Sequence, residues 1–274
     1  MADIGLTRGF MNMRSRRVSM GKEMVVYQKK DSVAMVTLNR PDSRNAINTQ
    51  MVAELEDIRN EISRDNDIRV VIITGKETFC TGTDAGELSL SENKAELIGR
   101  LSVASLVAGL DRPSIAAING EAFGQGLELA LACDLRICTE TARFAMNHMA
   151  SGDIPWDGGT QRLSRMVGRG KATEMILMGD VIDAREAHRI GLVNKVVPPQ
   201  EIMAVVMDMA QEIASRGPIG LRYAKEAVYK GMDLTLEQGL RLEADLYFLL
   251  HTTRDRTEGI RAFQEKRSPR FEGR

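Results

Sequence analysis

One stretch decides the fold: Ser114-Ile-Ala-Ala-Ile-Asn-Gly-Glu-Ala-Phe-Gly-Gln-Gly-Leu-Glu-Leu-Ala-Leu-Ala-Cys-Asp134. Its apolar start predicts a buried strand that leaves the core at Asn119-Gly120. Gly124 and Gly126 free the backbone to approach a ligand, and an apolar helix follows at once. The first N–H groups of a helix have no partner within it and lie at the positive end of its dipole. The stretch therefore predicts a turn that stabilises developing negative charge.

Glu128 places a carboxylate in the first turn of that helix, three residues after Gln125. Residues at this spacing share a helix face, so a proton-transfer group would lie beside the anion site. The alternative is a carboxylate that only complements the helix dipole. The apolar neighbours of Glu128 would bury its charge, and burial of a charge usually serves a function. We therefore prefer the catalytic interpretation.

Length and composition bound the class of protein. The 274 residues can form one large domain or a domain with an appendage, and the chain has 37 basic and 38 acidic residues. This balance argues against nucleic-acid binding and disorder, and no apolar run approaches the roughly 18 residues of a membrane span. Cys80, Cys133 and Cys138 form no CxxC pattern and share no ligand spacing with the histidines. We expect no metal site, no disulfide framework and a cytoplasmic location.

Strands and helices alternate through the first half of the chain. Residues 24–28 and 33–38 predict a hairpin, 48–58 an amphipathic helix, 69–74 a strand, 94–110 a second helix, and 135–138 a strand. This order is typical of repeated β-β-α units around a mainly parallel sheet. Beyond Thr160 the pattern predicts helices, with one last strand over 192–197. We divide the chain into a flexible N-terminal tail (1–22), a core domain (23–199) and a C-terminal helical region (200–274).

Several segments together resemble the enoyl-CoA hydratase/isomerase (crotonase) family. The family's Asn-Gly, glycine turn and Glu occur at 119–128, and the other matches follow in the family's order: Leu38-Asn-Arg-Pro41, Asn45-Ala-Ile47, Phe79-Cys-Thr-Gly-Thr-Asp84, Gly158-Gly-Thr-Gln-Arg-Leu163, Gly191-Leu-Val-Asn194 and Phe263-Gln-Glu-Lys-Arg267. The resemblance covers about residues 24 to 274. It implies an α/β fold, a crotonase-like β-β-α superhelix with a C-terminal helical appendage. It also implies a homotrimer or homohexamer in which the appendage serves oligomerisation and CoA binding.

The resemblance implies roles for four residues of the reacting centre. The N–H groups of Thr83 and Gln125 would form an oxyanion hole that polarises a thioester carbonyl. Glu128 matches the first of the two catalytic glutamates of the hydratases, and counting from Phe144 places His148 where the second would stand. A histidine can donate or accept a proton near pH 7, and if His148 takes over the role of the second glutamate, we expect it across the acyl site with room for one water between it and Glu128. A packing role for His148 is equally open.

The loop Ile154-Pro-Trp-Asp-Gly-Gly159 departs from many relatives, which have small residues at its third and fourth positions. Asp157 is a candidate acid or base by proximity only, and a turn or helix-cap carboxylate is at least as good an interpretation. Trp156 would either wall the acyl pocket with a flat apolar face or pack in the core.

For the CoA half of a substrate, the resemblance points to both ends of the chain. The implied contacts are the backbone around Arg44, Asn45 and Ala46, the Asp84-Ala85 turn, and Phe263 and Lys266 of a neighbouring subunit. A lysine near nucleotide phosphates is electrostatically favourable. The alternative for Lys266 is an ordinary solvated charge.

We therefore expect an acyl-CoA enzyme, an enoyl-CoA hydratase-type lyase that adds or removes water through a stabilised enolate. It would need no metal or redox cofactor, with coenzyme A as part of the substrate. The alternatives among enzymes are a hydratase of an alicyclic or dienoyl-CoA in aromatic degradation, an enoyl-CoA isomerase, and an acyl-CoA hydrolase or dehalogenase. The alternative outside enzymes is a catalytically silent scaffold of this fold, including one that binds RNA. The glycine turns and Glu128 count against the scaffold.

Overall fold

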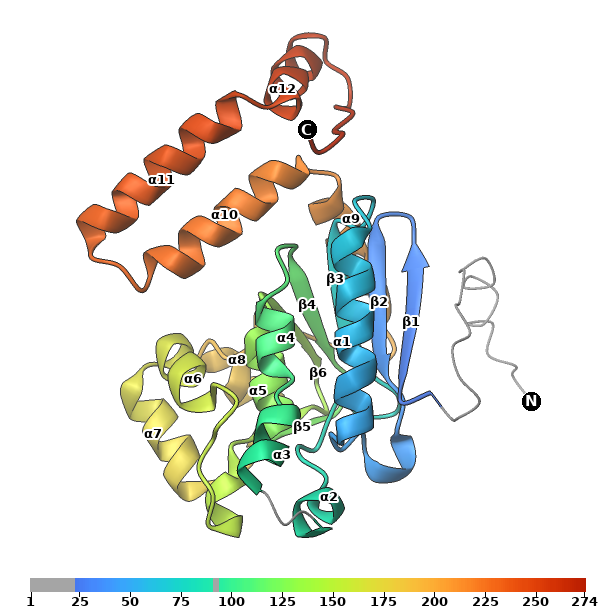
Figure 1. The fold of residues 1–274 in the computed structure, drawn as a ribbon, viewed down its shortest axis with the longest axis vertical. Coiled ribbons are helices and arrows are strands. Elements are labelled where there is room, and N and C mark those ends of the chain that lie inside the picture. The colour runs from blue at the N-terminus through green and yellow to red at the C-terminus, as the bar shows by residue number, and fades with distance from the viewer. Residues whose placement is uncertain (1–22, 91–93) are drawn as a thin grey trace.

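The centre of the molecule is a six-stranded sheet in the order β1-β2-β3-β4-β6-β9 (Figure 1). The computed structural model describes residues 23–90 and 94–274, so the tail predicted over 1–22 lies outside the described residues. The strands are β1 (Val25–Lys30), β2 (Val33–Leu38), β3 (Val70–Gly75), β4 (Ser114–Ile118), β6 (Leu135–Thr139) and β9 (Lys195–Val197). Only the β1–β2 pair is antiparallel. The predicted mainly parallel sheet is therefore present.

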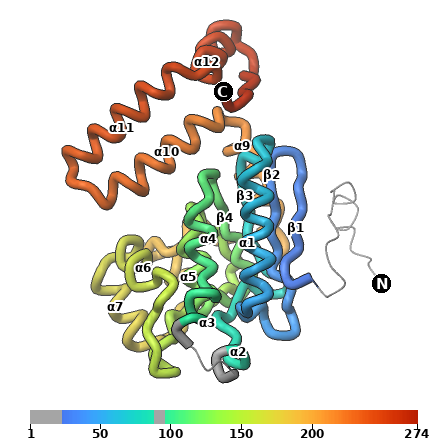
Figure 2. The backbone as a smooth tube through the Cα atoms, in the orientation of Figure 1, coloured from blue at the N-terminus to red at the C-terminus, as the bar shows by residue number. Residues whose placement is uncertain are grey.

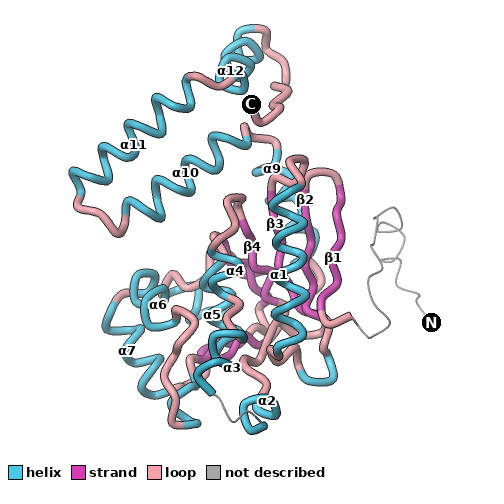
Figure 3. Tube along the Cα trace, in the orientation of Figure 1, coloured by secondary structure: helices cyan, strands magenta, loops and turns pink. Residues whose placement is uncertain are grey.

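Helices cover both faces of this sheet, as buried parallel strands require (Figure 3). Along β3, Val71 and Ile73 belong to one apolar cluster, which includes α1 (Thr49–Arg64), while Val70 and Ile72 belong to the other. This second cluster contains Val206 and other apolar residues of α9 (Ile202–Ala214). Since every residue of β3 is buried, its apolar run reflects packing on both sides.

A second, small sheet lies beside the first and was not predicted. It pairs β5 (Glu121–Phe123) with β7 (Arg143–Ala145), and β7 with β8 (Ile182–Asp183). The parallel β5–β7 pair places Phe123 opposite Ala145. The glycine turn after β5 and the segment after β7 therefore leave the small sheet side by side.

The remaining helices of the core lie between β3 and β9 along the chain. They are α2 (Ala85–Leu90), α3 (Lys94–Arg100), α4 (Ala104–Ala108), α5 (Gln125–Ala132), α6 (Gly159–Val167), α7 (Arg169–Met178) and α8 (Ala184–Arg189), with short 3-10 turns at Pro41–Ser43 and Asn147–Ser151. The single helix predicted over 94–110 is wrong, because the chain breaks between α3 and α4. At the break, the carboxylate of Asp157 accepts hydrogen bonds from the N–H groups of Val103 and Ala104.

The C-terminal helices leave the core as an arm (Figure 2). It consists of α10 (Pro218–Gly231), α11 (Leu236–His251) and α12 (Arg254–Gln264), and α10 and α11 form an antiparallel pair. The boundary predicted at 199 falls before α9, which belongs to the sheet packing. The arm itself begins near Pro218.

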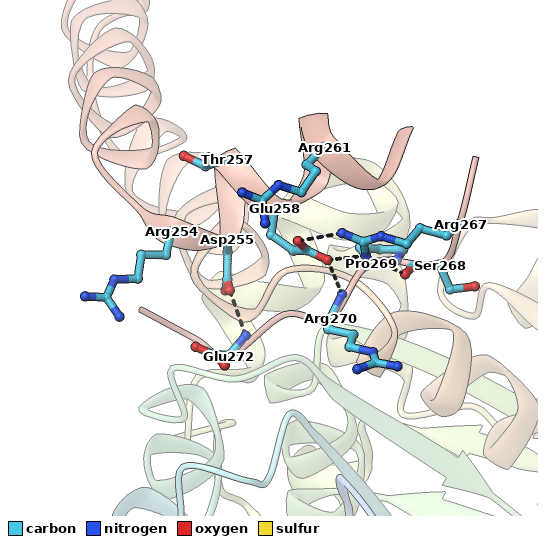
Figure 4. A pocket seen from close by; sticks show the side chains of 10 residues that line it. All are labelled: Arg254, Asp255, Thr257, Glu258, Arg261, Arg267, Ser268, Pro269, Arg270 and Glu272. Atoms are coloured by element: carbon cyan, nitrogen blue, oxygen red, sulfur yellow. Dashed lines mark hydrogen bonds and ion pairs between the residues drawn. The ribbon is translucent and has the colours of Figure 1, made fainter. Parts of the chain in front are cut away.

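The end of the chain folds back onto α12 (Figure 4). Asp255 accepts hydrogen bonds from the N–H groups of Glu272 and Gly273 at 2.7 and 2.9 Å. Glu258 pairs with Arg267, whose hydrogen bonds lower the pKa of the Glu258 carboxyl to about 2. These bonds border a hollow of about 890 Å³, which Arg254, Arg261 and Arg270 also line.

In the described part of the chain, no helix is both long and apolar enough to cross a membrane. No group of three or more His, Cys, Asp or Glu side chains there is arranged to hold a metal ion. Cys80, Cys133 and Cys138 are free thiols, and burial raises the pKa of each to about 12. The thiolate is the reactive form, so these buried thiols are unreactive in the folded protein.

Candidate active site

The glycine turn within residues 119–126 lies against a second glycine turn within residues 79–84, the segment of the family resemblance that contains Gly82. Cys80 and Phe123 join them through backbone hydrogen bonds, with Phe123 N donating to Cys80 O at 3.0 Å. A side chain on Gly126 would put its Cβ only 2.2 Å from the same oxygen, so the close approach requires glycine. Across the junction, the Thr83 hydroxyl donates to Gln125 Oε1 at 2.8 Å.

Two backbone donors are available at this junction. Gln125 is the first residue of α5, so its N–H has no partner within the helix, whereas Leu127 N and Glu128 N donate to Gly124 O. Over residues 23–90 and 94–274, neither the Thr83 N–H nor the Gln125 N–H has a protein acceptor. These are the two donors expected from the resemblance. A donor aimed at developing negative charge in a water-excluded site is typically worth about 3 kcal/mol.

The carboxylate of Glu128 is fully buried next to these donors. Its Oε1 accepts hydrogen bonds from Asp157 N at 2.9 Å and Gly159 N at 2.7 Å. Its Oε2 faces Nε2 of His148 at 3.3 Å. Because two N–H groups occupy one oxygen, Oε2 is the atom available for proton transfer.

His148 lies in the 3-10 turn after β7 and packs against the Gly124 turn. A Cβ on Gly124 would lie 3.7 Å from the imidazole Cε1. The 3.3 Å contact with Glu128 leaves no space for a water on the line between the groups, so the expectation of an intervening water is wrong. Within the described residues, Oε2 of Glu128 and both ring nitrogens of His148 lack a well-aligned hydrogen bond. Buried polar atoms without partners cost about 1–3 kcal/mol each, which is tolerated mainly at functional sites.

Asp157 lies in the same region but its carboxylate is already occupied. It accepts hydrogen bonds from four donors: Ser102 Oγ at 2.7 Å, Val103 N at 2.8 Å, Ala104 N at 2.9 Å and Gln125 Nε2 at 3.2 Å. The side chain therefore caps α4, which favours the helix-cap interpretation over an acid or base role. The helix that Asp157 caps is α4, which is distant in the sequence, and not α6, which directly follows Asp157.

Trp156 stands next to the groups that hold Glu128. Its ring is half-buried and packs against the larger apolar cluster of the core. Both predicted roles, pocket wall and packing, agree with this position.

The loop expected to bind CoA is rigid and adjoins the oxyanion turn. Arg44 and Asn45 have positive φ angles of 49° and 56°, and the buried Asn45 amide donates to the carbonyls of Lys76 and Thr78. Ile47 forms a bridge to Thr83, which links the loop to the turn.

The rest of the expected CoA-binding region is held by hydrogen bonds and an ion pair between its own residues. Arg40 donates to the Ala46 carbonyl and pairs with Asp84 at 2.9 Å. Asp84 also accepts from Gly86 N within the turn that opens α2 at Ala85. The loop backbone and the Asp84-Ala85 turn thus form one preorganised surface.

Phe263 and Lys266 lie far from this surface within one chain. Both are exposed at the end of α12, and the Phe263 side chain is 85% exposed. Figure 1 shows α12 at the opposite end of the molecule from α2, α3 and β5. A role for these two residues in CoA binding therefore requires a second subunit.

Sequence reasoning did not identify every residue of the site. Gly159 N donates a hydrogen bond to Glu128 Oε1. The segment that contains Gly159 was recognised as a family motif, but this role was not predicted. Ser102 and the Leu101 carbonyl bind Asp157 and Gln125 respectively. They carry no local signal, because their contacts depend on residues more than 20 positions away.

Two unpaired backbone N–H groups beside a buried carboxylate, on a mainly parallel sheet covered by helices, make up the candidate active site of an α/β enzyme. The family model for enoyl-CoA hydratase/isomerase matches residues 28–274. A putative enoyl-CoA hydratase/isomerase, YngF of Bacillus subtilis, is 44% identical over 261 residues, covering 93% of this chain and all of that protein. The crotonyl-CoA hydratase of Syntrophomonas wolfei is 38% identical, covering 92% of this chain and 99% of its own. The 2,3-dehydroadipyl-CoA hydratase of Escherichia coli is 37% identical over 258 residues, 91% of this chain and 99% of that one.

A solved structure agrees with these relatives. The enoyl-CoA hydratase of Bacillus anthracis superposes with a TM-score of 0.88 at 39% identity, covering 92% of this chain and all of that one. The chain belongs to the enoyl-CoA hydratase/isomerase family. The predicted fold class and the prediction of a hydratase-type acyl-CoA enzyme are confirmed.

We predict that Glu128→Gln abolishes most turnover without weakening ligand binding. The glutamine keeps an oxygen for Asp157 N and Gly159 N but replaces Oε2 by an amide that accepts no proton. Turnover should fall by about 10²- to 10⁴-fold, the usual contribution of a general acid or base. Steady-state kinetics and calorimetric titration with an unreactive acyl-CoA measure both quantities. Glu140→Gln, the same change at an exposed position, is the matched control. If Glu128→Gln keeps activity within a few-fold of the parent, Glu128 has only a structural role.

Proposed function

We propose that this protein adds water across the α,β double bond of a 2-enoyl-CoA thioester, with Glu128 and His148 as its proton-transfer pair. The observation that carries the proposal is the free Oε2 of Glu128, 3.3 Å from His148 Nε2 and beside two free backbone donors. The relatives named as hydratases supply the substrate class.

The reaction follows from these positions. The N–H groups of Thr83 and Gln125 would bind the thioester oxygen and stabilise the enolate that forms when water oxygen attacks the β-carbon. The Glu128–His148 pair takes one proton from that water and returns one proton to the α-carbon. Hydroxide and a proton are thus added in total, and the pair is left unchanged. Since Glu128 Oε1 is engaged, the transfers run through Oε2 and the imidazole.

The same contact also fits the isomerase alternative. A double-bond isomerase moves one proton between two carbons of the acyl chain, for which one shared pair suffices. Crotonyl-CoA, a 3-enoyl-CoA and an alicyclic dienoyl-CoA in isotopically labelled water separate the candidates. Label on the β-carbon supports hydration and identifies the acyl class, and double-bond migration without label there supports isomerisation. No change across the panel would refute both in favour of the silent scaffold.

We predict that His148→Ala lowers turnover of the preferred enoyl-CoA by about 10²- to 10⁴-fold, with little change in affinity for an unreactive analogue. The exposed His188→Ala is the control for loss of an imidazole. If activity survives His148→Ala and collapses in Asp157→Asn, the partner of Glu128 lies on the 155–159 loop.

We further propose that the chain works in the cytoplasm as a homotrimer or homohexamer, with no resident cofactor and CoA only as part of the substrate. The reduced, buried cysteines support the compartment. The oligomer is supported by large apolar side chains that the arm exposes: Val228, Tyr229, Met232, Leu236, Leu240, Tyr247, Phe248 and Leu249. Apolar patches of this kind usually mark protein interfaces, and Phe263 and Lys266 could then reach a neighbour's CoA loop.

We predict that the parent elutes at three or six times the 30.3 kDa chain mass and that Phe248→Glu dissociates it. Phe248 is 69% exposed in one chain, so a charge there is harmless to the monomer but costly in an apolar interface. Light scattering coupled to size exclusion measures the mass. Ser63→Glu, on the exposed face of α1, controls for the added charge. A monomeric parent would contradict the proposal.

A further inference from the structure

Three side chains at the site form a hydrogen-bonded chain that the catalytic roles do not use. The Thr83 hydroxyl donates to Gln125 Oε1 at 2.8 Å. The Gln125 amide nitrogen donates to the Leu101 carbonyl at 2.6 Å and to Asp157 Oδ2 at 3.2 Å. Gln125 is 1% exposed and Asp157 6%, so their end of the hydrogen-bonded chain is shielded from water, while Thr83 is half-buried. We call Thr83, Gln125 and Asp157 the tether.

The direction of every bond in the tether is fixed. A carboxylate and a carbonyl only accept hydrogen bonds, so the Gln125 NH₂ must face Asp157 and Leu101. Its Oε1 must then face Thr83, and the hydroxyl of Thr83 must donate. A flipped amide would set two acceptors against each other at one end of the side chain. The Asp157 carboxylate thus dictates the conformation of two residues beyond it.

The tether joins the two residues whose backbone N–H groups are the candidate oxyanion donors. Nothing else among the described side chains links Thr83 directly to Gln125. Holding these side chains together limits how far the two turns can separate. Because donors contribute fully only when aimed at the oxyanion from hydrogen-bond distance, a small separation would reduce their effect.

The tether also reaches the proton-transfer group. Asp157 N donates to Glu128 Oε1, while the Asp157 side chain holds Gln125 and the start of α4. One residue therefore fixes the position of Glu128 relative to the donors. Movement of the 155–159 loop would displace both at once.

We infer that Asp157, acting through Gln125 and Thr83, is a positioning residue that sets the geometry of the oxyanion donors and aligns Glu128 with them. The inference rests on the proposed function and extends it, since it assigns a role to the side chains of Gln125 and Asp157, which proton transfer leaves unexplained. The tether needs no contact with the substrate.

The direct test is the carbonyl infrared band of bound butyryl-CoA carrying an isotopic label at the thioester carbon. This saturated thioester has no double bond to hydrate, so the band reports polarisation by the donors whether or not the protein turns over. The parent should shift the band to lower frequency. Asp157→Asn and Gln125→Leu should each lose much of the shift, while Asp153→Asn, an exposed change just before the loop, should keep it.

Thr83 provides a second pair of variants that keeps the buried carboxylate intact. Thr83→Val preserves shape and backbone but removes the hydroxyl donor, so the shift of the carbonyl band should decrease. Thr83→Ser retains the donor, so its carbonyl band should shift as in the parent. A parent shift that persists undiminished in Thr83→Val, Gln125→Leu and Asp157→Asn would overturn the inference alone. A parent that shows no shift would overturn the oxyanion hole, and the inference with it.

Kinetics test whether the three residues act as one unit. Asp157→Asn and Gln125→Leu should each lower kcat about 10-fold and leave KM nearly unchanged, and the double variant should lose about the same 10-fold. The pH profile should keep its shape in Asp157→Asn, because a positioning residue donates no proton. A double variant that loses the product of the single effects, or a missing limb of the pH profile, would contradict the tether.

Discussion

The hydrogen bonds from Asp157 N and Gly159 N to one oxygen of Glu128 are the constraint on which the site depends. A fully buried carboxylate is costly unless its oxygens are bonded, and two N–H donors offset that cost on Oε1 alone. The second oxygen is left for His148 and a substrate. The same two bonds fix the start of α6 against α5, so the local fold and the chemistry share one set of contacts.

The sheet explains why the two glycine turns meet. β3 and β4 are parallel neighbours, so the segments that leave their carboxyl ends emerge at the same edge. The first leads to Thr83 and the second to Gln125. Ligands in α/β proteins commonly bind at such an edge, where loops carry polar groups over a rigid support. The small β5–β7 pair then adds His148 to the same place.

Much of this arrangement could be predicted from the sequence, because its signals are local. The alternating and apolar runs gave residues 33–38 as a strand, in agreement with β2, and the glycine turn followed by an apolar helix gave α5. The helix predicted over 94–110 failed because its break is imposed by Asp157, which is remote in the sequence. The strands β5, β7 and β8 have only two or three residues each, too few for any periodic pattern. The 3.3 Å contact between Glu128 and His148 was equally hidden, since it depends on the pairing of β5 with β7.

The central claim is that one chain brings two backbone donors and the free oxygen of Glu128 to a single acyl group. A crystal structure of the full-length protein with bound butyryl-CoA tests it most directly. The account predicts the thioester oxygen within about 2.7–3.1 Å of both Thr83 N and Gln125 N, with Glu128 Oε2 facing the α- and β-carbons. A thioester oxygen bound elsewhere, or an acyl chain on the far side of α5 from Glu128, would contradict it.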